Sequence, residues 1–384
     1  MRIAVLGTSL LAAGAALVAT GVLPLAAAAD VGDRVWPILL FVVAITVVAE
    51  LAAEAGLFAS LAARLALASG GRTVVLWLLV VVMAVVSTAF LSLDTTAVLL
   101  TPVVVLLARH AGLSPLPFAL TTVWLANTGS LVLPVSNLTN LLARRVLGPD
   151  PLRFVTLLAP AAVVAVLVPC VIIAIVFRAP LRGRFAPSQP ADPRDRVLFL
   201  VSGVVVIVLL PLLVSGIPPW MPACGAAVVL VAVTALRNRR ALRLALVPWQ
   251  LVLFASGLFL VVEAVHALGS GPVLAAIAGT GDGPLDLLRV AGTGLVGANA
   301  VDNLPAYLAL EPAAGSPARI AALLVGVNAG PLITPWASLA TLLWHGRLRA
   351  LDVDLPWGRY LLLGLVAAPV TVALATLALA LTAG

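Results

Sequence analysis

Apolar runs of about 20 residues recur along this chain from end to end, and each is long enough to span a lipid bilayer as a helix. Only helices and closed β-barrels can span hydrocarbon, because it offers backbone groups no hydrogen-bonding partner. The short alternating segments typical of a barrel do not occur in the sequence. With 63% hydrophobic and 10% charged residues, the 384-residue chain has room for roughly ten membrane elements and no sizeable soluble domain. The sequence therefore predicts an all-α polytopic protein of the cell (plasma) membrane.

Two polar segments interrupt the apolar runs, and they resemble each other. Residues 127–143 read NTGSLVLPVSNLTNLLA, and residues 328–344, 201 positions later, read NAGPLITPWASLATLLW. Seven of the 17 aligned positions are identical, including one Asn, one Gly and one Pro in register. Broken helices at corresponding positions of two halves are typical of transporters, because unwound backbone at membrane depth must line a cavity or be buried in protein. The pattern predicts a carrier.

Two arginine-rich loops indicate how the halves are arranged. They cover residues 178–196 and 237–245, and two apolar segments lie between them. Two spans return the chain to its starting side, so both loops are expected in the cytoplasm under the positive-inside rule. The net charge of +7 is attributed to this bias, and no binding of nucleic acid is expected.

The predicted organisation has four parts. Residues 1–34 form a retained N-terminal helix, although its small-residue end also resembles a signal-peptide cleavage site. Residues 35–177 form the first transporter repeat, 178–245 the cytoplasmic basic linkers with two connecting spans, and 246–384 the second, inverted repeat. Each repeat is expected to contain a broken helix and a re-entrant hairpin. For residues 73–109, a span followed by a partial helix is the alternative.

Six acidic residues lie within the apolar segments and not in loops: Glu50, Glu54, Asp94, Glu263, Asp302 and Glu311. An ionisable group at membrane depth costs about 2.5–3.5 kcal/mol on insertion scales, so it is a functional candidate by default. Asp94 and Asp302 are expected to be counterparts in the two hairpins, and Glu50 and Glu263 in the helices before them. These four are predicted to couple transport to protons, because a poorly solvated carboxylate can exchange its proton near neutral pH. The alternatives are helix capping for the two Asp residues and a polar helix–helix contact for the two Glu residues.

The candidate binding residues are the acidic and neutral polar side chains of the hairpins and breaks: Asp94, Thr95, Thr96, Asn127, Thr128, Ser130, Ser136, Asn137, Asp302, Asn303, Asn328, Thr334 and Ser338. Freed N–H and C=O groups at the helix breaks add partial charges. Such a cavity suits a small polar or oxyanionic solute. Close packing of small polar residues between helices would explain any one of them, but not their repetition. Neither catalytic residues nor a metal or cofactor site is expected, because metal-ligand spacing, a phosphate loop and nucleophile motifs do not occur.

The segment 328–344 resembles the late signature of the ArsB-type arsenite efflux permeases. These belong to the ion transporter superfamily, together with citrate/dicarboxylate and NhaD-type sodium/proton carriers. Residues 126–140 resemble the first broken helix of that family, while Asp94 ahead of LLTP and the sequence DNLP at 302–305 resemble its two hairpins. The resemblance covers about residues 35–380. It implies a secondary active transporter that exports arsenite or antimonite by proton-coupled antiport.

The chain departs from the family pattern at five positions. The family often carries an acidic residue where this chain has Asn127 and Asn328, an Asn-Asn pair where it has Asp302 and Asn303, and a basic residue after the late Gly-Pro where it has Leu332. The acidic group has thus changed place, and sodium/proton antiport or dicarboxylate/citrate symport with the same fold remains the alternative function. The expected partners are a small inorganic solute, protons or sodium, and the lipid bilayer. The resemblance also allows an ArsA-type ATPase and a second copy of the chain as partners.

Overall fold

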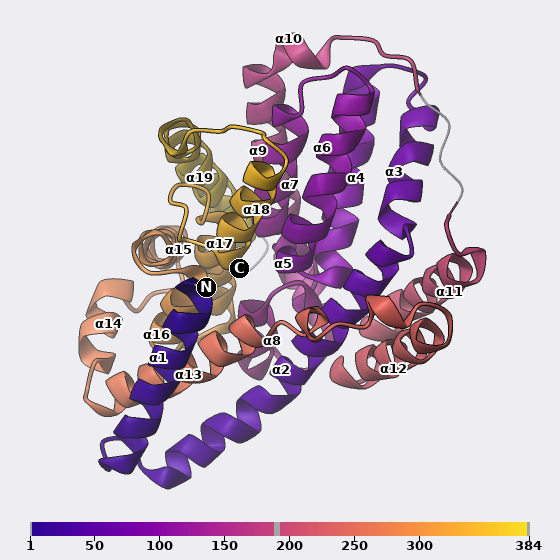
Figure 1. Ribbon diagram of the computed structural model, residues 1–384. Helices are drawn as coiled ribbons and strands as arrows, with labels where there is room; N and C mark the ends of the chain where they lie inside the picture. The colour runs from indigo at the N-terminus through magenta and orange to yellow at the C-terminus, as the bar shows by residue number, and fades with distance from the viewer. Residues whose placement is uncertain (1, 188–192, 382–384) are drawn as a thin grey trace.

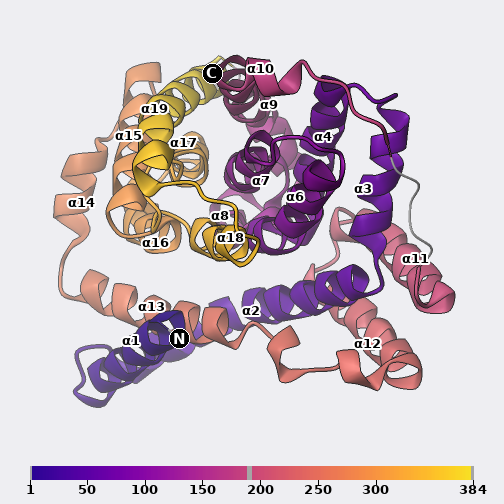
Figure 2. The same cartoon turned by 45° about the horizontal axis from the view of Figure 1, so that its top comes forward.

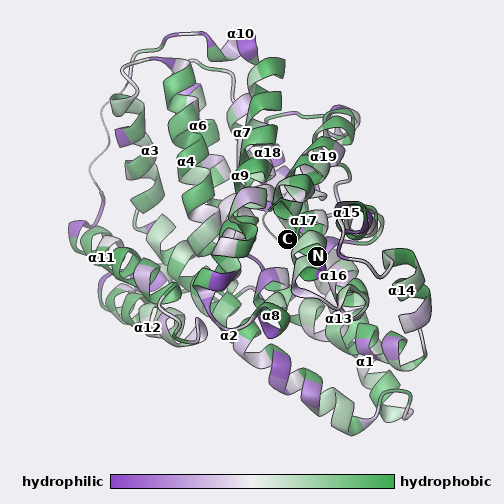
Figure 3. Ribbon diagram, turned by 180° about the vertical axis from the view of Figure 1, so that it is seen from behind, coloured by the Kyte–Doolittle hydropathy of each residue, from purple (hydrophilic) through white to green (hydrophobic). Residues whose placement is uncertain are grey.

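The computed structural model describes residues 2–187 and 193–381. This part of the chain consists of helices and their connections, with one isolated β-bridge between Arg72 and Arg184. Eight helical segments in it are long and apolar enough to cross a membrane, by length and composition. They are Leu25–Glu54 (α2), Thr73–Leu91 (α4), Leu93–His110 (α5 and α6), Pro151–Val176 (α9), Arg196–Leu213 (α11), Trp220–Arg237 (α12), Trp249–Ala267 (α13) and Trp357–Ala380 (α19). Figure 3 shows hydrophobic residues along these long helices. The fold is that of an all-α polytopic membrane protein, as predicted.

Shorter helices complete the fold. They are α1 (Arg2–Ala19), α3 (Leu57–Ala68), α7 (Leu116–Thr128), α8 (Leu138–Leu147), α10 (Arg178–Leu181), α14 (Gly271–Ala278), α15 (Pro284–Ala300), α16 (Asn303–Ala314), α17 (Pro317–Ala329) and α18 (Leu339–Ala350); within Leu93–His110, α5 is Leu93–Thr95 and α6 is Thr101–His110. Of the four predicted parts, Met1, residues 188–192 of the first basic loop and residues 382–384 lie outside the described residues.

The helices form two groups, which Figures 1 and 2 show side by side. The helices α1, α2, α11, α12 and α13 form a layer along one side of a bundle that contains α4 to α9 and α15 to α19. Within the layer, α1 packs on α13 and α2 packs on α12. A Cβ at Gly257 of α13 would collide with the backbone of α1 at Leu11, so glycine at this position lets the two helices touch.

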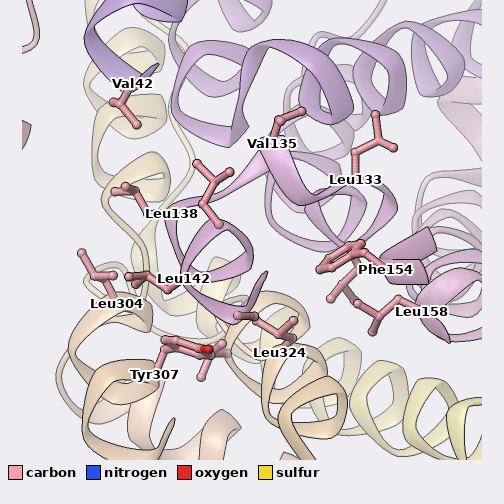
Figure 4. Packing of buried hydrophobic residues seen from close by; sticks show 14 of the residues in the cluster. Val42, Leu133, Val135, Leu138, Leu142, Phe154, Leu158, Leu304, Tyr307 and Leu324 are labelled. Atoms are coloured by element: carbon pink, nitrogen blue, oxygen red, sulfur yellow. The ribbon is translucent and has the colours of Figure 1, made fainter. Parts of the chain in front are cut away.

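The first broken helix is held in place by apolar contacts. Leu138 and Leu142 of α8 belong to one buried cluster with Val42 of α2, Leu304 of α16 and Leu324 of α17 (Figure 4). Of these neighbours, Val42 comes from the layer that contains α2, and Leu304 and Leu324 come from the second half of the chain. Close packing of this kind positions α8 between α2, α16 and α17.

The two predicted hairpins are present, and each turns at a residue with positive φ. The chain turns after α4 at Ser92 (φ 82°) and after α15 at Asp302 (φ 152°). At the first tip, Thr96 Oγ1 donates a hydrogen bond of 2.9 Å to Ser87 Oγ, nine residues earlier. A straight helix would separate these two residues by about 13 Å. The chain therefore turns back on itself here.

The second hairpin repeats this geometry at a fixed interval. A Cβ built on Gly297 would lie 3.2 Å from the Cβ of Ala306, again nine residues later. Gly297, Asp302 and Ala306 lie 210 positions after Ser87, Ser92 and Thr96, respectively. The counterpart of Asp302 is therefore Ser92. The expected pairing of Asp94 with Asp302 is wrong, because Asp94 stands two positions beyond the turn.

The beginning of the chain also differs from the prediction. The boundary expected after residues 1–34 falls inside α2, which begins at Leu25 directly after Pro24. Asp30 and Asp33 lie near the start of α2 and are exposed, and the helix continues through them.

Candidate functional site

Each broken helix consists of two helices joined by an irregular segment. Residues 129–137 separate α7 from α8, and residues 330–338 separate α17 from α18. The last residues of these segments, Asn137 and Ser338, have nearly the same backbone angles, with φ of −149° and −150° and ψ of 149° and 134°. They lie 201 positions apart, which is the interval of the sequence repeat.

Asn328 of α17 joins the two broken helices. Its Oδ1 accepts hydrogen bonds from Asn137 Nδ2 (2.8 Å) and Thr139 Oγ1 (2.9 Å), and its Nδ2 donates to Asn140 Oδ1 (2.7 Å). All four side chains are buried. A buried polar group that loses its partner costs about 1–3 kcal/mol, so these three bonds fix α17 against α8.

Asn127 of α7 makes the reciprocal connection less firmly. Its Nδ2 donates to Val123 O in its own helix (2.9 Å) and to Thr341 Oγ1 of α18 at 3.5 Å. Its buried Oδ1 has no hydrogen-bond partner in the part of the chain that the structure describes. Asn127 precedes Asn328, and Asn140 precedes Thr341, by the same 201 positions. The two cross-connections are therefore related by the sequence repeat.

The first break is stabilised by its own side chains. Ser130 Oγ donates to Asn127 O (2.6 Å), and Ser136 Oγ donates to the carbonyls of Leu133 (2.6 Å) and Ser130. Asn140 Nδ2 donates to the same two carbonyls, of Ser130 (2.7 Å) and Leu133 (3.1 Å). Ser130 and Ser136 therefore satisfy backbone groups that the break leaves unpaired.

The second break is held by Asn299 of α15, a residue that the sequence analysis did not identify. Asn299 Nδ2 donates to Gly330 O (2.9 Å), and Oδ1 accepts from the Thr334 backbone N–H (3.0 Å) and hydroxyl (3.3 Å). The backbone carbonyl of Asn299 also accepts from Trp336 Nε1 (2.8 Å). Thr334 is therefore used to anchor the break. Because Asn299 lies one turn before Asp302, it ties the second hairpin to the second broken helix.

A small cavity lies where the hairpin tips meet the starts of α8 and α18. Its polar lining consists of Asp94, Asn137, Asp302, Asn303 and Ser338. It offers about 20 Å³ to the centre of a water-sized molecule, which is enough for one water. The two hairpins and the two broken helices thus each contribute polar groups to one point.

The two aspartates of this cavity are held differently. Asp302 caps α16, because its Oδ1 accepts from Leu304 N (3.1 Å), and the neighbouring Asn303 N donates to Ala337 O (3.0 Å). The carboxylate of Asp94 accepts no hydrogen bond from the described part of the chain. The capping interpretation therefore describes Asp302 and does not describe Asp94.

A larger pocket of about 430 Å³ adjoins the small cavity, and both are lined by Asp94 and Leu339. Glu50 of α2 and residues 244–251, at the end of the α12–α13 connection and the start of α13, form much of its wall. The polar cavity is thus reached from the side of the α12–α13 connection.

The charged side chains that line the two cavities are all acidic. The lining residues include the carboxylates of Glu50, Asp94 and Asp302 and no Arg, Lys or His side chain. Among the described residues, no group of three His, Cys, Asp or Glu side chains could hold a metal ion. Such a site repels anions and suits protons, cations or neutral solutes that donate hydrogen bonds.

The structure brings most of the predicted site residues together, in two sets. Those that line the cavities are Glu50, Asp94, Thr95, Asn137, Asp302, Asn303 and Ser338. Those that hold the breaks are Asn127, Ser130, Ser136, Asn328 and Thr334. Thr96 instead bonds to Ser87 at the first hairpin tip, and Thr128 is buried without a hydrogen-bond partner among the described residues.

Glu263 does not belong to this site. Its Oε2 lies 3.8 Å from Nη2 of Arg34, and both side chains line a separate pocket. Glu263 is also twelve residues along α13 from Leu251, which lines both site cavities, and twelve residues of helix span about 18 Å. The order of residues in the two halves did not reveal the distance between Glu263 and the cavities, because Glu263 lies near the end of α13 and the cavities lie near its start.

Paired broken helices, paired hairpins and a polar cavity between them define a multi-pass secondary membrane transporter. Residues 2–341 match the family model CitMHS, described as "Citrate transporter", and the chain belongs to this family. It is a membrane carrier and not an enzyme, and carriers of this family in bacteria lie in the plasma membrane.

The chain is similar to curated proteins over nearly its whole length. It is 30% identical to an arsenical pump membrane protein of Escherichia coli, covering 92% of this chain and 88% of that protein. It is 24% identical to a putative arsenical pump membrane protein of Bacillus subtilis, covering 92% and 89%. Among solved structures, the Alcanivorax borkumensis YdaH transporter, described as having an unusual topology, matches with a TM-score of 0.54 at 17% identity, covering 91% of this chain and 86% of that one. This last likeness concerns the fold alone.

Proposed function

We propose that this protein exports arsenite or antimonite in exchange for protons. The observation that carries the proposal is the lining of the two cavities, with three carboxylates, neutral amides and hydroxyls, and no cationic side chain. Near neutral pH arsenite is a neutral trihydroxide, whose O–H groups can donate to carboxylate and amide oxygens. The names of the curated relatives support the same solute class.

Antiport follows if the proton and the solute compete for the same carboxylates. Asp94 and Asp302 line the small cavity, and either one can accept hydrogen bonds from the solute when ionised or carry a proton when it is neutral. Binding of one ligand therefore opposes binding of the other. Glu50 and Asp94 both line the larger pocket, where Glu50 can deliver protons to Asp94.

The direction of transport depends on the orientation of the chain. We assign residues 237–245 to the cytoplasm on the positive-inside rule, and the adjoining residues 244–251 line the larger pocket. In this orientation the pocket receives solute from the cytoplasm. The proposed arrangement also places the two halves in opposite senses across the membrane, as in carriers built from inverted repeats.

Symport of citrate or another carboxylate is the second candidate, favoured by the description of the matching family. An anion in this site would face three carboxylates without a cationic partner, which makes the site unfavourable unless a cation enters with it. Sodium could serve as that cation. The two candidates therefore differ in both substrate and coupling ion.

Everted membrane vesicles test the proposal. Arsenite uptake driven by a pH gradient should fall at least tenfold in Asp302→Asn and in Asp94→Asn at unchanged protein abundance, because Asn keeps the shape but cannot titrate. Asp352→Asn is the matched control, since it removes an exposed loop carboxylate and should leave uptake unchanged. Normal pH-driven uptake in both cavity variants would refute proton coupling. Sodium-dependent citrate uptake without arsenite transport would establish the second candidate.

A further inference from the structure

Three arginines surround a hollow that is separate from the transport cavities. Arg34 of α2 and Arg144 and Arg145 of α8 line a pocket of about 460 Å³. Its remaining lining is mostly apolar, with Phe41 and Leu142 among the side chains, and it includes no carboxylate. The hollow thus combines concentrated positive charge with a hydrophobic wall.

The hollow lies where a membrane surface is expected. Its lining includes Pro149, just before α9, and Gly216 and Trp220, at the turn between α11 and α12. The ends of three span-length helices therefore meet there. Arg34 lies twenty residues before the end of α2 at Glu54, and twenty helical residues match the roughly 30 Å of a bilayer core.

A pair of tryptophans lies at the same expected depth in the membrane. The rings of Trp36 and Trp220 lie 5.4 Å apart, and Trp36 is 49% exposed. Tryptophan is enriched at the membrane–water interface, where its ring sits among lipid headgroups. The rim of the hollow is therefore placed at headgroup depth.

Two of the three arginines have a donor without a partner among the described residues. The Nε groups of Arg34 and Arg144 are buried, and neither has a hydrogen-bond partner within residues 2–187 and 193–381. Arg144 donates from Nη2 to Pro149 O, and Arg34 has a long ion pair with Glu263 at 3.8 Å. A phosphate group offers several oxygens to such donors, and guanidinium groups bind phosphate through paired hydrogen bonds.

We propose that this hollow binds an anionic phospholipid of the surrounding bilayer, with its phosphate at Arg144 and Arg145 and an acyl chain along the apolar wall. Free phosphate would leave that wall uncovered, and a zwitterionic lipid brings no net negative charge to the arginines. The site also accounts for the basic residues at the end of α8, just before α9, which lie one membrane span away from the basic loop that begins at Arg178. A positive-inside bias does not explain charge at both ends of the same span.

Arg34 is the less informative position, because it is ion-paired with Glu263. Arg34 and Arg145 both also line the neighbouring pocket that contains Asp30, Asp33 and Glu263, whereas Arg144 does not. The test therefore uses Arg144 and Arg145. Delipidated protein in detergent is titrated with phosphatidylglycerol, phosphatidylcholine or inorganic phosphate, and binding is followed by native mass spectrometry and by the shift in Tm.

Phosphatidylglycerol should bind and raise Tm, while phosphatidylcholine and phosphate should do neither. The double variant Arg144→Gln/Arg145→Gln should bind phosphatidylglycerol at least about tenfold more weakly, because it loses two charge-assisted contacts. The matched control Arg347→Gln/Arg349→Gln removes two arginines from the end of α18 and should bind normally. A second variant, Ile38→Trp, fills the hollow without changing charge and should also lose the lipid.

Equal binding of phosphatidylcholine, or an equal Tm shift with phosphate alone, would overturn the assignment to an anionic lipid. Undiminished phosphatidylglycerol binding in both the arginine variant and Ile38→Trp would overturn the location. If the arginine variant does not fold, Ile38→Trp still decides the location.

Discussion

Replacing Asn328 by Ala should destabilise the protein far more than replacing Asn127 by Ala, although the two residues occupy equivalent positions in the repeat. Asn328 makes three side-chain hydrogen bonds to the other broken helix, of 2.7–2.9 Å, whereas Asn127 makes one, of 3.5 Å. Hydrogen bonds between membrane helices contribute about 0.6 kcal/mol on average and about 1.7 kcal/mol at most. Three of them give about 2–5 kcal/mol for Asn328→Ala, and the weak contact of Asn127 gives about 1 kcal/mol or less.

Purified protein in a mild detergent is suitable for this measurement, with unfolding followed by tryptophan fluorescence. A double-mutant cycle between Asn328→Ala and Asn140→Ala should show coupling, because Asn328 Nδ2 donates to Asn140 Oδ1. The cycle between Asn127→Ala and Asn140→Ala should show much weaker coupling, since no hydrogen bond joins these two side chains in the described structure. Equal destabilisation by Asn328→Ala and Asn127→Ala, or additivity in the first cycle, would refute the reasoning.

Three further predictions concern other parts of the molecule. Asn299→Ala should lower the maximal transport rate more than it lowers protein abundance. Asn299→Asp should recover part of the rate, because Asp still accepts the hydrogen bond from Thr334 but cannot donate to Gly330. Equal losses of rate and abundance in both variants would contradict this prediction. The hydrogen bond from Arg237 and the capping N–H groups of α11 lower the pKa of Asp195. The native protein should therefore have a higher Tm than Asp195→Asn above about pH 4, and this difference should disappear as the pH falls further. A Tm difference that persists in acid would refute this prediction. Gly257→Leu should detach α1 from α13 and expose the N-terminal helix to protease, and full protection would contradict the close contact.

Much of the architecture could be predicted from the sequence, because the signals were local. Length and hydropathy defined the spans, and Gly, Pro and Asn within apolar runs marked both helix breaks. Residues 129–137 and 330–338 are irregular, as the repeated segments indicated. Breaks of this kind follow from backbone chemistry at single positions, so a single sequence suffices to locate them.

The contacts within the site could not be predicted in the same way, because they depend on how helices from distant parts of the chain pack. Asn299 carries no local sign of its role, since its partners Gly330 and Thr334 lie more than 30 residues later. The alignment of the hairpins failed for a related reason. Asp94 and Asp302 share chemistry, but the turn is set by backbone angles at Ser92, where a serine gave no signal in the sequence.

The bonds between the two broken helices also limit where the molecule can open. Parting α8 from α17 would break three buried hydrogen bonds at Asn328 at once, and the interior offers no water to replace them. The wall that the α12–α13 connection and the start of α13 contribute to the larger pocket is mostly apolar, so sliding there breaks few directional bonds. The easiest motion therefore carries the two broken helices together, as one body, past the layer that contains α2 and α13.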